Sequence, residues 1–126
     1  MNLKLKLGTN DIFEGVPVTT IRNNLEIMID EWISKGLPAS HLIITTLPPR
    51  RPGESSRIPA LNSQIRTLAQ SKGIKLVDIA FLTSNDDGLT WKSPTLHPTN
   101  DEIHYAESVR DSIADLVVSI MLQATP

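Results

Sequence analysis

The chain has 126 residues and a formal net charge of −2, and 40% of its residues are hydrophobic. This length and composition predict one globular domain over residues 1–126. The small negative charge argues against nucleic acid and against an anionic membrane as partners, and no apolar stretch is long enough to span a bilayer. The absence of cysteine excludes disulfides and thiolate chemistry.

The N-terminal half begins with leucines and lysines that alternate over residues 3–7, which predicts a strand that ends at Gly8. The lysines interrupt any apolar core of a signal peptide, so we expect a cytoplasmic protein if Met1 is the natural start. Apolar residues then recur at helical spacing up to Ile33, and Thr19 or Thr20 is the expected cap of this helix. The β-branched run at residues 41–46 predicts a second strand.

The C-terminal half repeats this pattern. A helix is expected from about Ile58 to Lys72, where Gly73 stops it, and residues 74–79 predict a third strand. A long polar loop covers about residues 80–100 and contains a predicted turn at residues 85–88. The last predicted helix has an apolar face formed by Val109, Ile113, Leu116, Val117 and Ile120.

Alternating strands and helices indicate a parallel sheet with right-handed crossovers. Functional sites in such sheets lie at the carboxyl ends of the strands. Two short blocks are placed accordingly, since Gly8-Thr9-Asn10-Asp11 follows the first strand and Asp101-Glu102-Ile103-His104 precedes the last helix.

In this order, the two blocks resemble two signature blocks of the SGNH (GDSL-type) ester hydrolases. The resemblance continues through Leu61-Asn62 and residues 75–78, and therefore covers nearly the whole chain as the family's C-terminal portion. It implies an α/β fold in three layers, with helices on both faces of a parallel sheet. This is the flavodoxin-like SGNH hydrolase fold lacking its first strands.

The resemblance also implies roles for three residues. Asn10 would donate a hydrogen bond to the oxyanion that forms during ester hydrolysis. His104 would be the general base, and Asp101 would fix its tautomer and orientation. The expected activity is that of an esterase or acetyl-ester deacetylase that acts on small acyl esters without a cofactor.

The family's Gly-Asp-Ser nucleophile block has no counterpart, because only seven residues precede Gly8 and none is serine. The serine could lie on a lost segment or on another polypeptide, or His104 could activate water directly. Ser55 or Ser56 could substitute for it, although either could instead cap the helix that begins near Ile58. Weak or no activity is therefore expected from this chain alone.

The alternative function is that of a catalytically inactive SGNH-derived remnant that dimerises or binds a ligand. In the family, the strand that carries the asparagine block lies inside the sheet, whereas here Lys4 and Lys6 are typical of an edge strand. The strand at residues 3–7 could therefore pair with its twin in a homodimer. No metal site is expected, because the three histidines lack zinc-like spacing.

Overall fold

The computed structural model describes residues 3–5, 15–49, 56–92 and 107–122. Strands and helices alternate along these residues, except that two helices follow the last strand. The elements in chain order are β1 (Leu3–Leu5), α2 (Val18–Ser34), a 3-10 turn (Ala39–His41), β2 (Leu42–Thr45), α3 (Ile58–Lys72), β3 (Lys75–Val77), α4 (Ile79–Thr83) and α5 (Glu107–Met121).

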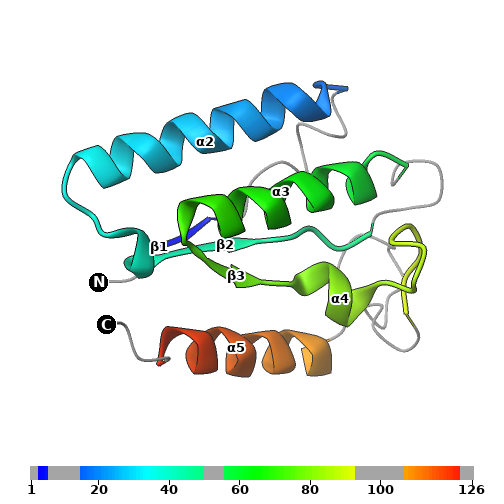
Figure 1. Cartoon of the computed structure of the whole chain (residues 1–126). Helices are drawn as coiled ribbons and strands as arrows, with labels where there is room; N and C mark the ends of the chain where they lie inside the picture. Colours follow the sequence, from blue (N-terminus) through cyan, green and yellow to red (C-terminus); the bar gives the residue numbers. More distant parts are fainter. Residues whose placement is uncertain (1–2, 6–14, 50–55, 93–106, 123–126) are drawn as a thin grey trace.

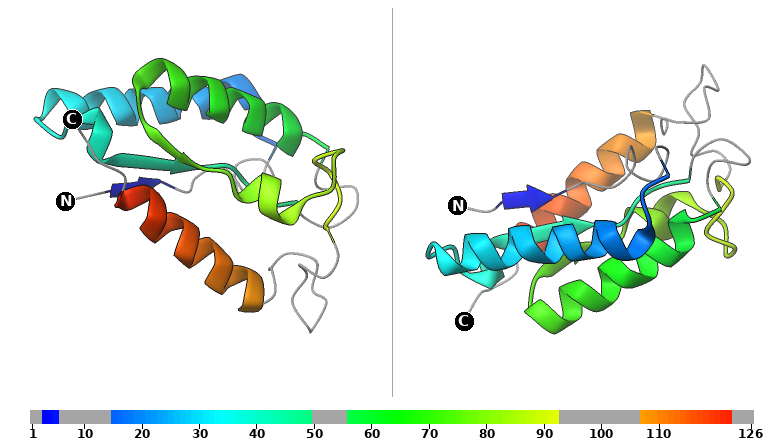
Figure 2. Two further views of the ribbon diagram at one scale, coloured as in Figure 1. Left: turned by 60° about the horizontal axis from the view of Figure 1, so that its bottom comes forward. Right: turned by 90° about the horizontal axis from the view of Figure 1, so that it is seen from above.

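The three described strands form one parallel sheet in the order β1-β2-β3. Ile43 of β2 pairs with Lys4 on one side and with Lys75 on the other. Helices α2 and α3 cover one face of the sheet, and α5 lies against the opposite face (Figures 1 and 2). This arrangement confirms the predicted α/β fold in three layers.

Strand β2 is the centre of the sheet, and all four of its residues are buried. Leu42 and Ile44 belong to a large cluster with the apolar faces of α2 and α3. Ile43 belongs to a smaller cluster on the other face, with Ile113 and Ile120 of α5. Successive side chains of a strand point to opposite faces, so one strand contributes to both cores.

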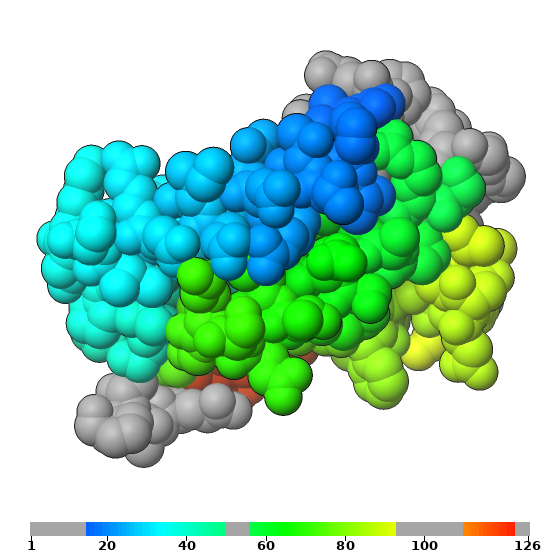
Figure 3. Space-filling model, turned by 45° about the horizontal axis from the view of Figure 1, so that its top comes forward, coloured from blue at the N-terminus to red at the C-terminus, as the bar shows by residue number. Residues whose placement is uncertain are grey.

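Helices α2 and α3 lie side by side over the sheet, as Figure 3 shows. Their buried residues recur at helical spacing, which is why both helices present one apolar stripe to the sheet. On the outside, Lys72 of α3 pairs with Asp30 at 2.8 Å and with Glu26 at 3.3 Å, both on α2. No helix in the described parts of the chain is long and apolar enough to cross a membrane.

The helix boundaries differ from the prediction at both expected caps. Helix α2 begins one residue before Thr19, with Pro17 as its N-cap and no capping side chain, so the threonine cap is wrong. Arg57 is the N-cap of α3, again without a capping side chain, so Ser56 is not the cap either. Gly73 ends α3 in the left-handed conformation, with φ of 68°, as its position predicted.

The third strand is shorter than predicted, because the backbone turns into α4 after Asp78. The Asp78 carboxylate accepts a hydrogen bond from the Phe81 N–H at 3.2 Å and so caps α4. A capped turn therefore replaces the last residues expected in the strand. Of the predicted strand at residues 3–7, Lys6 and Leu7 lie outside the described residues.

Candidate functional site at the carboxyl edge of the sheet

A hydrogen-bonded network joins the carboxyl ends of β2 and β3. Thr46 directly follows β2, and its Oγ1 donates to Asp78 Oδ1 at 2.8 Å. Thr46 Oγ1 also accepts a hydrogen bond from the Ala80 N–H at 2.9 Å. The backbone continues the link, because the Thr46 N–H donates to the Val77 carbonyl at 3.2 Å. The two strand ends and the start of α4 are therefore held in one fixed arrangement.

Arg66 of α3 completes this network from the helical layer. Its Nε lies 2.9 Å from Asp78 Oδ2, and its second guanidinium nitrogen lies 3.1 Å from Oδ1, which is a bidentate pairing. Partial burial opposes ionisation of Asp78, but hydrogen bonds from Arg66, Thr46 and the Phe81 N–H stabilise the carboxylate. The pKa of Asp78 therefore lies below its usual value.

Replacing Asp78 with asparagine should lower the free energy of unfolding by about 1–2 kcal/mol at pH 7. The pKa of Asp78 is lower in the folded state, so its stabilisation is present above the unfolded pKa of about 3.9 and is lost as the pH falls through the folded pKa. Urea unfolding of the wild type and of Asp78→Asn between pH 7 and pH 3 measures this pH dependence of the free energy of unfolding.

The stability difference between wild type and Asp78→Asn should narrow below about pH 4. Asp86→Asn is a matched control, because Asp86 is an exposed aspartate in the turn that follows α4. A difference in the free energy of unfolding between wild type and Asp78→Asn that stayed constant over this pH range would contradict the lowered pKa of Asp78.

Asn62 of α3 fixes the segment that leaves β2. Its Oδ1 accepts from the Leu47 N–H at 2.8 Å, and its Nδ2 donates to the Leu47 carbonyl at 2.9 Å. Both residues are buried, so water does not replace these bonds. The amide thus sets the direction in which the chain departs toward residues 50–55, which carry Ser55.

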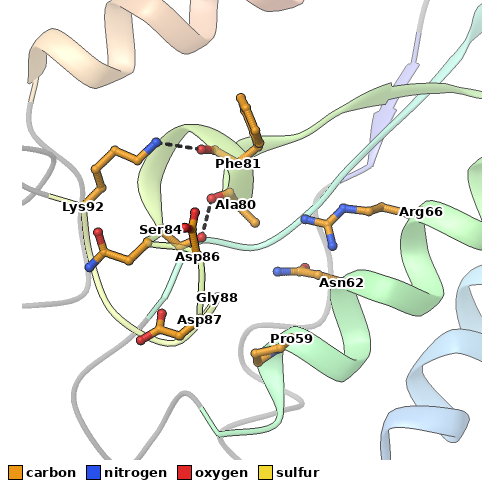
Figure 4. Close-up of a pocket in the computed structure, with 11 residues that line it drawn as sticks. Pro59, Asn62, Arg66, Ala80, Phe81, Ser84, Asp86, Asp87, Gly88 and Lys92 are labelled. Carbon is orange, nitrogen blue, oxygen red and sulfur yellow. Dashed lines mark hydrogen bonds between the residues drawn. The ribbon is translucent and has the colours of Figure 1, made fainter.

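A pocket of about 280 Å³ lies between α3, α4 and the turn at residues 84–88. Figure 4 shows Asn62 and Arg66 extending from α3 toward this turn. Lys92 closes one side, where its Nζ donates to the Phe81 carbonyl at 3.2 Å. The pocket is lined by Pro59, Asn62, Arg66, Ala80, Phe81, Ser84, Asn85, Asp86, Asp87, Gly88 and Lys92.

The polar groups of this pocket are largely committed to the fold. The Asn62 amide binds the backbone of Leu47, and Arg66 binds Asp78. Asp87 accepts from the Leu89 and Thr90 N–H groups at 2.8 and 3.0 Å. The Gly88 N–H donates to the Asn85 carbonyl at 2.9 Å, which confirms the turn predicted at residues 85–88. The polar side chains that line the pocket therefore stabilise the fold beside the carboxyl edge of the sheet.

Trp91, which follows this turn, forms an isolated antiparallel bridge with Ser84 and does not line the pocket. No group of three or more metal-binding side chains occurs within residues 15–49, 56–92 and 110–122.

Most of the predicted catalytic residues lie outside the described residues. These are Asn10, Ser55, Asp101 and His104. Ser56 is described, and it is exposed in the turn directly before α3. The structure therefore describes the strands and helices that flank these segments in the chain, and the roles of these residues stay predictions.

Sequence reasoning missed the network of Thr46, Arg66 and Asp78 and the bridge from Asn62. One signal was available for Asn62, because a polar residue between Leu61 and Ile65 falls on the apolar face of its helix. A buried asparagine needs partners, although the sequence does not say which ones.

A family model described as "GDSL-like Lipase/Acylhydrolase family" matches residues 5–101. The chain belongs to this family. The matched range includes Asn10, both candidate serines and Asp101, and it ends three residues before His104. No curated protein matches the sequence.

Solved structures of GDSL-type proteins have the same fold. A G-D-S-L family protein from Desulfitobacterium hafniense superposes with a TM-score of 0.76 at 15% identity, over 93% of this chain and 63% of that one. A GDSL-like lipase from Bacteroides thetaiotaomicron superposes with a TM-score of 0.76 at 18% identity, over 94% of this chain and 61% of that one. A member of the lipolytic G-D-S-L family from Veillonella parvula superposes with a TM-score of 0.67 at 20% identity, over 96% of this chain and 63% of that one.

The chain thus spans about three fifths of the length of each of these solved proteins. More than a third of each relative has no counterpart in these 126 residues.

Proposed function

We propose that this chain is a carboxylic-ester hydrolase of the SGNH type that acts on small acyl esters, including acetyl esters. The observation that carries the proposal is the family match over residues 5–101, which contains Asn10 and Asp101. Both residues belong to the two blocks on which the predicted site rests. His104 follows in the second block, at the spacing of three residues from Asp101.

The roles follow from the chemistry of ester hydrolysis. With water as nucleophile, His104 takes a proton from the water molecule while the water oxygen bonds to the acyl carbon. The negative charge on the carbonyl oxygen is stabilised by the Asn10 side-chain N–H, and Asp101 holds the imidazolium in place. The tetrahedral species then expels the alkoxide, which takes the proton back from His104 to give the alcohol and the acid.

A serine in place of water would give a two-step reaction through an acyl-enzyme. Ser55 and Ser56 lie in the stretch that leaves the carboxyl end of β2 and leads into α3. Ser56 is exposed and does not cap α3, so its hydroxyl is available for another role. We therefore keep both serines as candidate nucleophiles beside water.

A catalytically inactive remnant is the second candidate function. This function requires no Gly-Asp-Ser block, and these 126 residues contain none. Such a protein would keep the SGNH frame and act through dimerisation or ligand binding. The two functions differ in whether ester hydrolysis depends on the predicted site.

Hydrolysis of p-nitrophenyl acetate by the purified chain should exceed the buffer rate and fall by about 10²–10³-fold in Asn10→Ala, because an oxyanion donor is lost. Thr9→Ala, the neighbouring substitution, should retain the rate and controls for damage to this segment. Circular dichroism should show that both variants fold.

The serine variants decide the nucleophile. Loss of the rate in Ser55→Ala or in Ser56→Ala identifies that serine, whereas a rate unchanged in both identifies water. A wild-type rate no higher than that of Asn10→Ala would reject the esterase and leave the inactive remnant.

A further inference from the structure

The turn at residues 85–88 contains the one Asp-Gly pair of the sequence, Asp87-Gly88, and no Asn-Gly pair occurs in the chain. In an unstructured chain, an aspartate before glycine is chemically labile, because the glycine has no side chain to hinder attack by its backbone nitrogen on the aspartate carboxyl. The fate of this pair therefore depends on how the folded turn holds the Asp87 carboxyl group and the Gly88 nitrogen.

The reaction at such a pair converts aspartate into isoaspartate in two steps. The Gly88 nitrogen bonds to Cγ of the protonated Asp87 carboxyl, and the nitrogen's proton leaves with the hydroxyl group as water, which gives a five-membered succinimide ring. Water then opens the ring at either carbonyl. Breaking the bond from the nitrogen to Cγ restores aspartate. Breaking the bond from the nitrogen to the main-chain carbonyl carbon gives isoaspartate, in which the main chain runs through Cγ.

The folded turn withholds the Asp87 carboxyl group from this reaction. Its Oδ1 accepts from the Leu89 N–H at 2.8 Å and from the Thr90 N–H at 3.0 Å, and its Oδ2 accepts from the Thr90 hydroxyl at 2.9 Å. These hydrogen bonds, led by the one from the Leu89 N–H, hold the pKa of Asp87 below its usual value. At neutral pH the group is thus a carboxylate, which has no hydroxyl group that could leave as water.

The Gly88 nitrogen is engaged as well. Its N–H donates to the Asn85 carbonyl at 2.9 Å, and the Asn85 N–H donates in turn to the Thr90 carbonyl at 2.9 Å. Gly88 has a φ of 69°, and a Cβ at this position would lie only 3.3 Å from Cγ of Pro59, so the turn packs closely against α3 (Figure 4). Ring closure requires the Gly88 N–H to leave its acceptor and the Asp87 side chain to rotate, and both movements open the turn.

We propose that Asp87-Gly88 is a latent modification site, which stays aspartate in the closed turn and forms isoaspartate when the turn opens. Isoaspartate lengthens the main chain by one carbon atom and moves the carboxylate onto Cα. The longer chain no longer matches the hydrogen bond that closes the turn between Asn85 and Thr90, and Gly88 loses its close fit against Pro59. Because this turn forms one side of the pocket beside α3 and α4, the modification alters the shape of that pocket.

Incubation of the purified chain at neutral pH and physiological temperature tests the protection. Trypsin cleaves after Lys75 and Lys92, so digestion releases the pair within residues 76–92. The aspartate and isoaspartate forms of this peptide have the same mass and are separated by liquid chromatography. The isolated peptide, incubated in the same buffer, is the reference without the fold. Isoaspartate should accumulate many-fold more slowly in the intact chain, and equal rates would overturn the proposal.

Thr90→Val removes the hydroxyl group that donates to Asp87 and keeps the size of the side chain. Isoaspartate should then form several-fold faster than in the wild type. Thr67→Val is the matched control, since Thr67 is an exposed threonine of α3 whose hydroxyl donates to the Ser63 carbonyl. This variant should keep the wild-type rate. An unchanged rate in Thr90→Val, or an equal acceleration in Thr67→Val, would contradict the protective role of the Asp87 hydrogen bonds.

Hydrogen exchange distinguishes opening of the turn from unfolding of the whole chain. In Thr90→Val, the Leu89 amide should exchange faster by about the same factor as isoaspartate formation, whereas the Ile43 and Ile44 amides of β2 should exchange as in the wild type. A matching acceleration at the β2 amides would show that the reaction follows global unfolding, and it would overturn the proposal.

Discussion

Replacing His104 with alanine should lower the rate of p-nitrophenyl acetate hydrolysis by about 10²–10⁴-fold, which is the typical contribution of a positioned general base. The imidazole is the group in the proposed site that accepts a proton from the nucleophile. Asn10 would still stabilise the oxyanion in this variant, so a small residual rate should remain. Initial rates at saturating and at low substrate give kcat and kcat/KM, and both should fall together.

His97 provides the matched control for this experiment. It lies within the stretch covered by the family match, whereas His104 lies three residues beyond it. His97→Ala should keep the wild-type rate if His104 is the base. The reverse pattern, with the rate lost in His97→Ala and kept in His104→Ala, would move the base to His97 and show that the block at residues 101–104 was wrongly assigned.

Replacing Asn62 with alanine should destabilise the fold by about 3 kcal/mol, because it leaves a buried N–H and a buried carbonyl of Leu47 without partners. For a domain of this size, a loss of that magnitude lowers the melting temperature by on the order of 10 °C. Differential scanning calorimetry measures both quantities. A melting temperature within about 2 °C of the wild type would contradict the assigned role.

Two further variants isolate the chemistry of the amide. Asn62→Asp keeps an acceptor for the Leu47 N–H but sets an oxygen against the Leu47 carbonyl, so it should also destabilise the protein at pH 7. Its defect should lessen in acid, where a protonated carboxyl donates a hydrogen bond. Ser63→Ala alters the exposed neighbour and should stay within about 0.5 kcal/mol of the wild type.

The sequence predicted the regular part of the fold from hydrophobic patterning. Strand β2 is an apolar, β-branched run buried on both faces, and such runs are typical of central parallel strands. Gly73 marked the end of α3 correctly, because the left-handed conformation there favours glycine. These features depend on neighbours in sequence, and local rules describe them well.

The features that escaped prediction depend on contacts between distant residues. Helix α4 is only five residues long, and its cap Asp78 is held by Arg66 and by Thr46, 32 residues away. The threonine cap of α2 failed for a local reason, because the helix starts at Val18 and Pro17 is its N-cap. For the catalytic residues, the resemblance supplied roles for Asn10, Asp101 and His104, and experiments on those residues have to test them.

The unequal cores of the two layers have a consequence for local unfolding. Among the side chains that the structure describes, the core above the sheet joins twelve buried residues from α2, α3, β2 and the segments next to the strands, whereas the core below contains five. Free energies of local opening follow the density of buried apolar contacts, so α5 should open while the upper layer remains intact. His104 lies three residues before Glu107, the first residue of α5. Any chemistry that depends on it would then be lost in a partial opening at temperatures where the rest of the protein is still native.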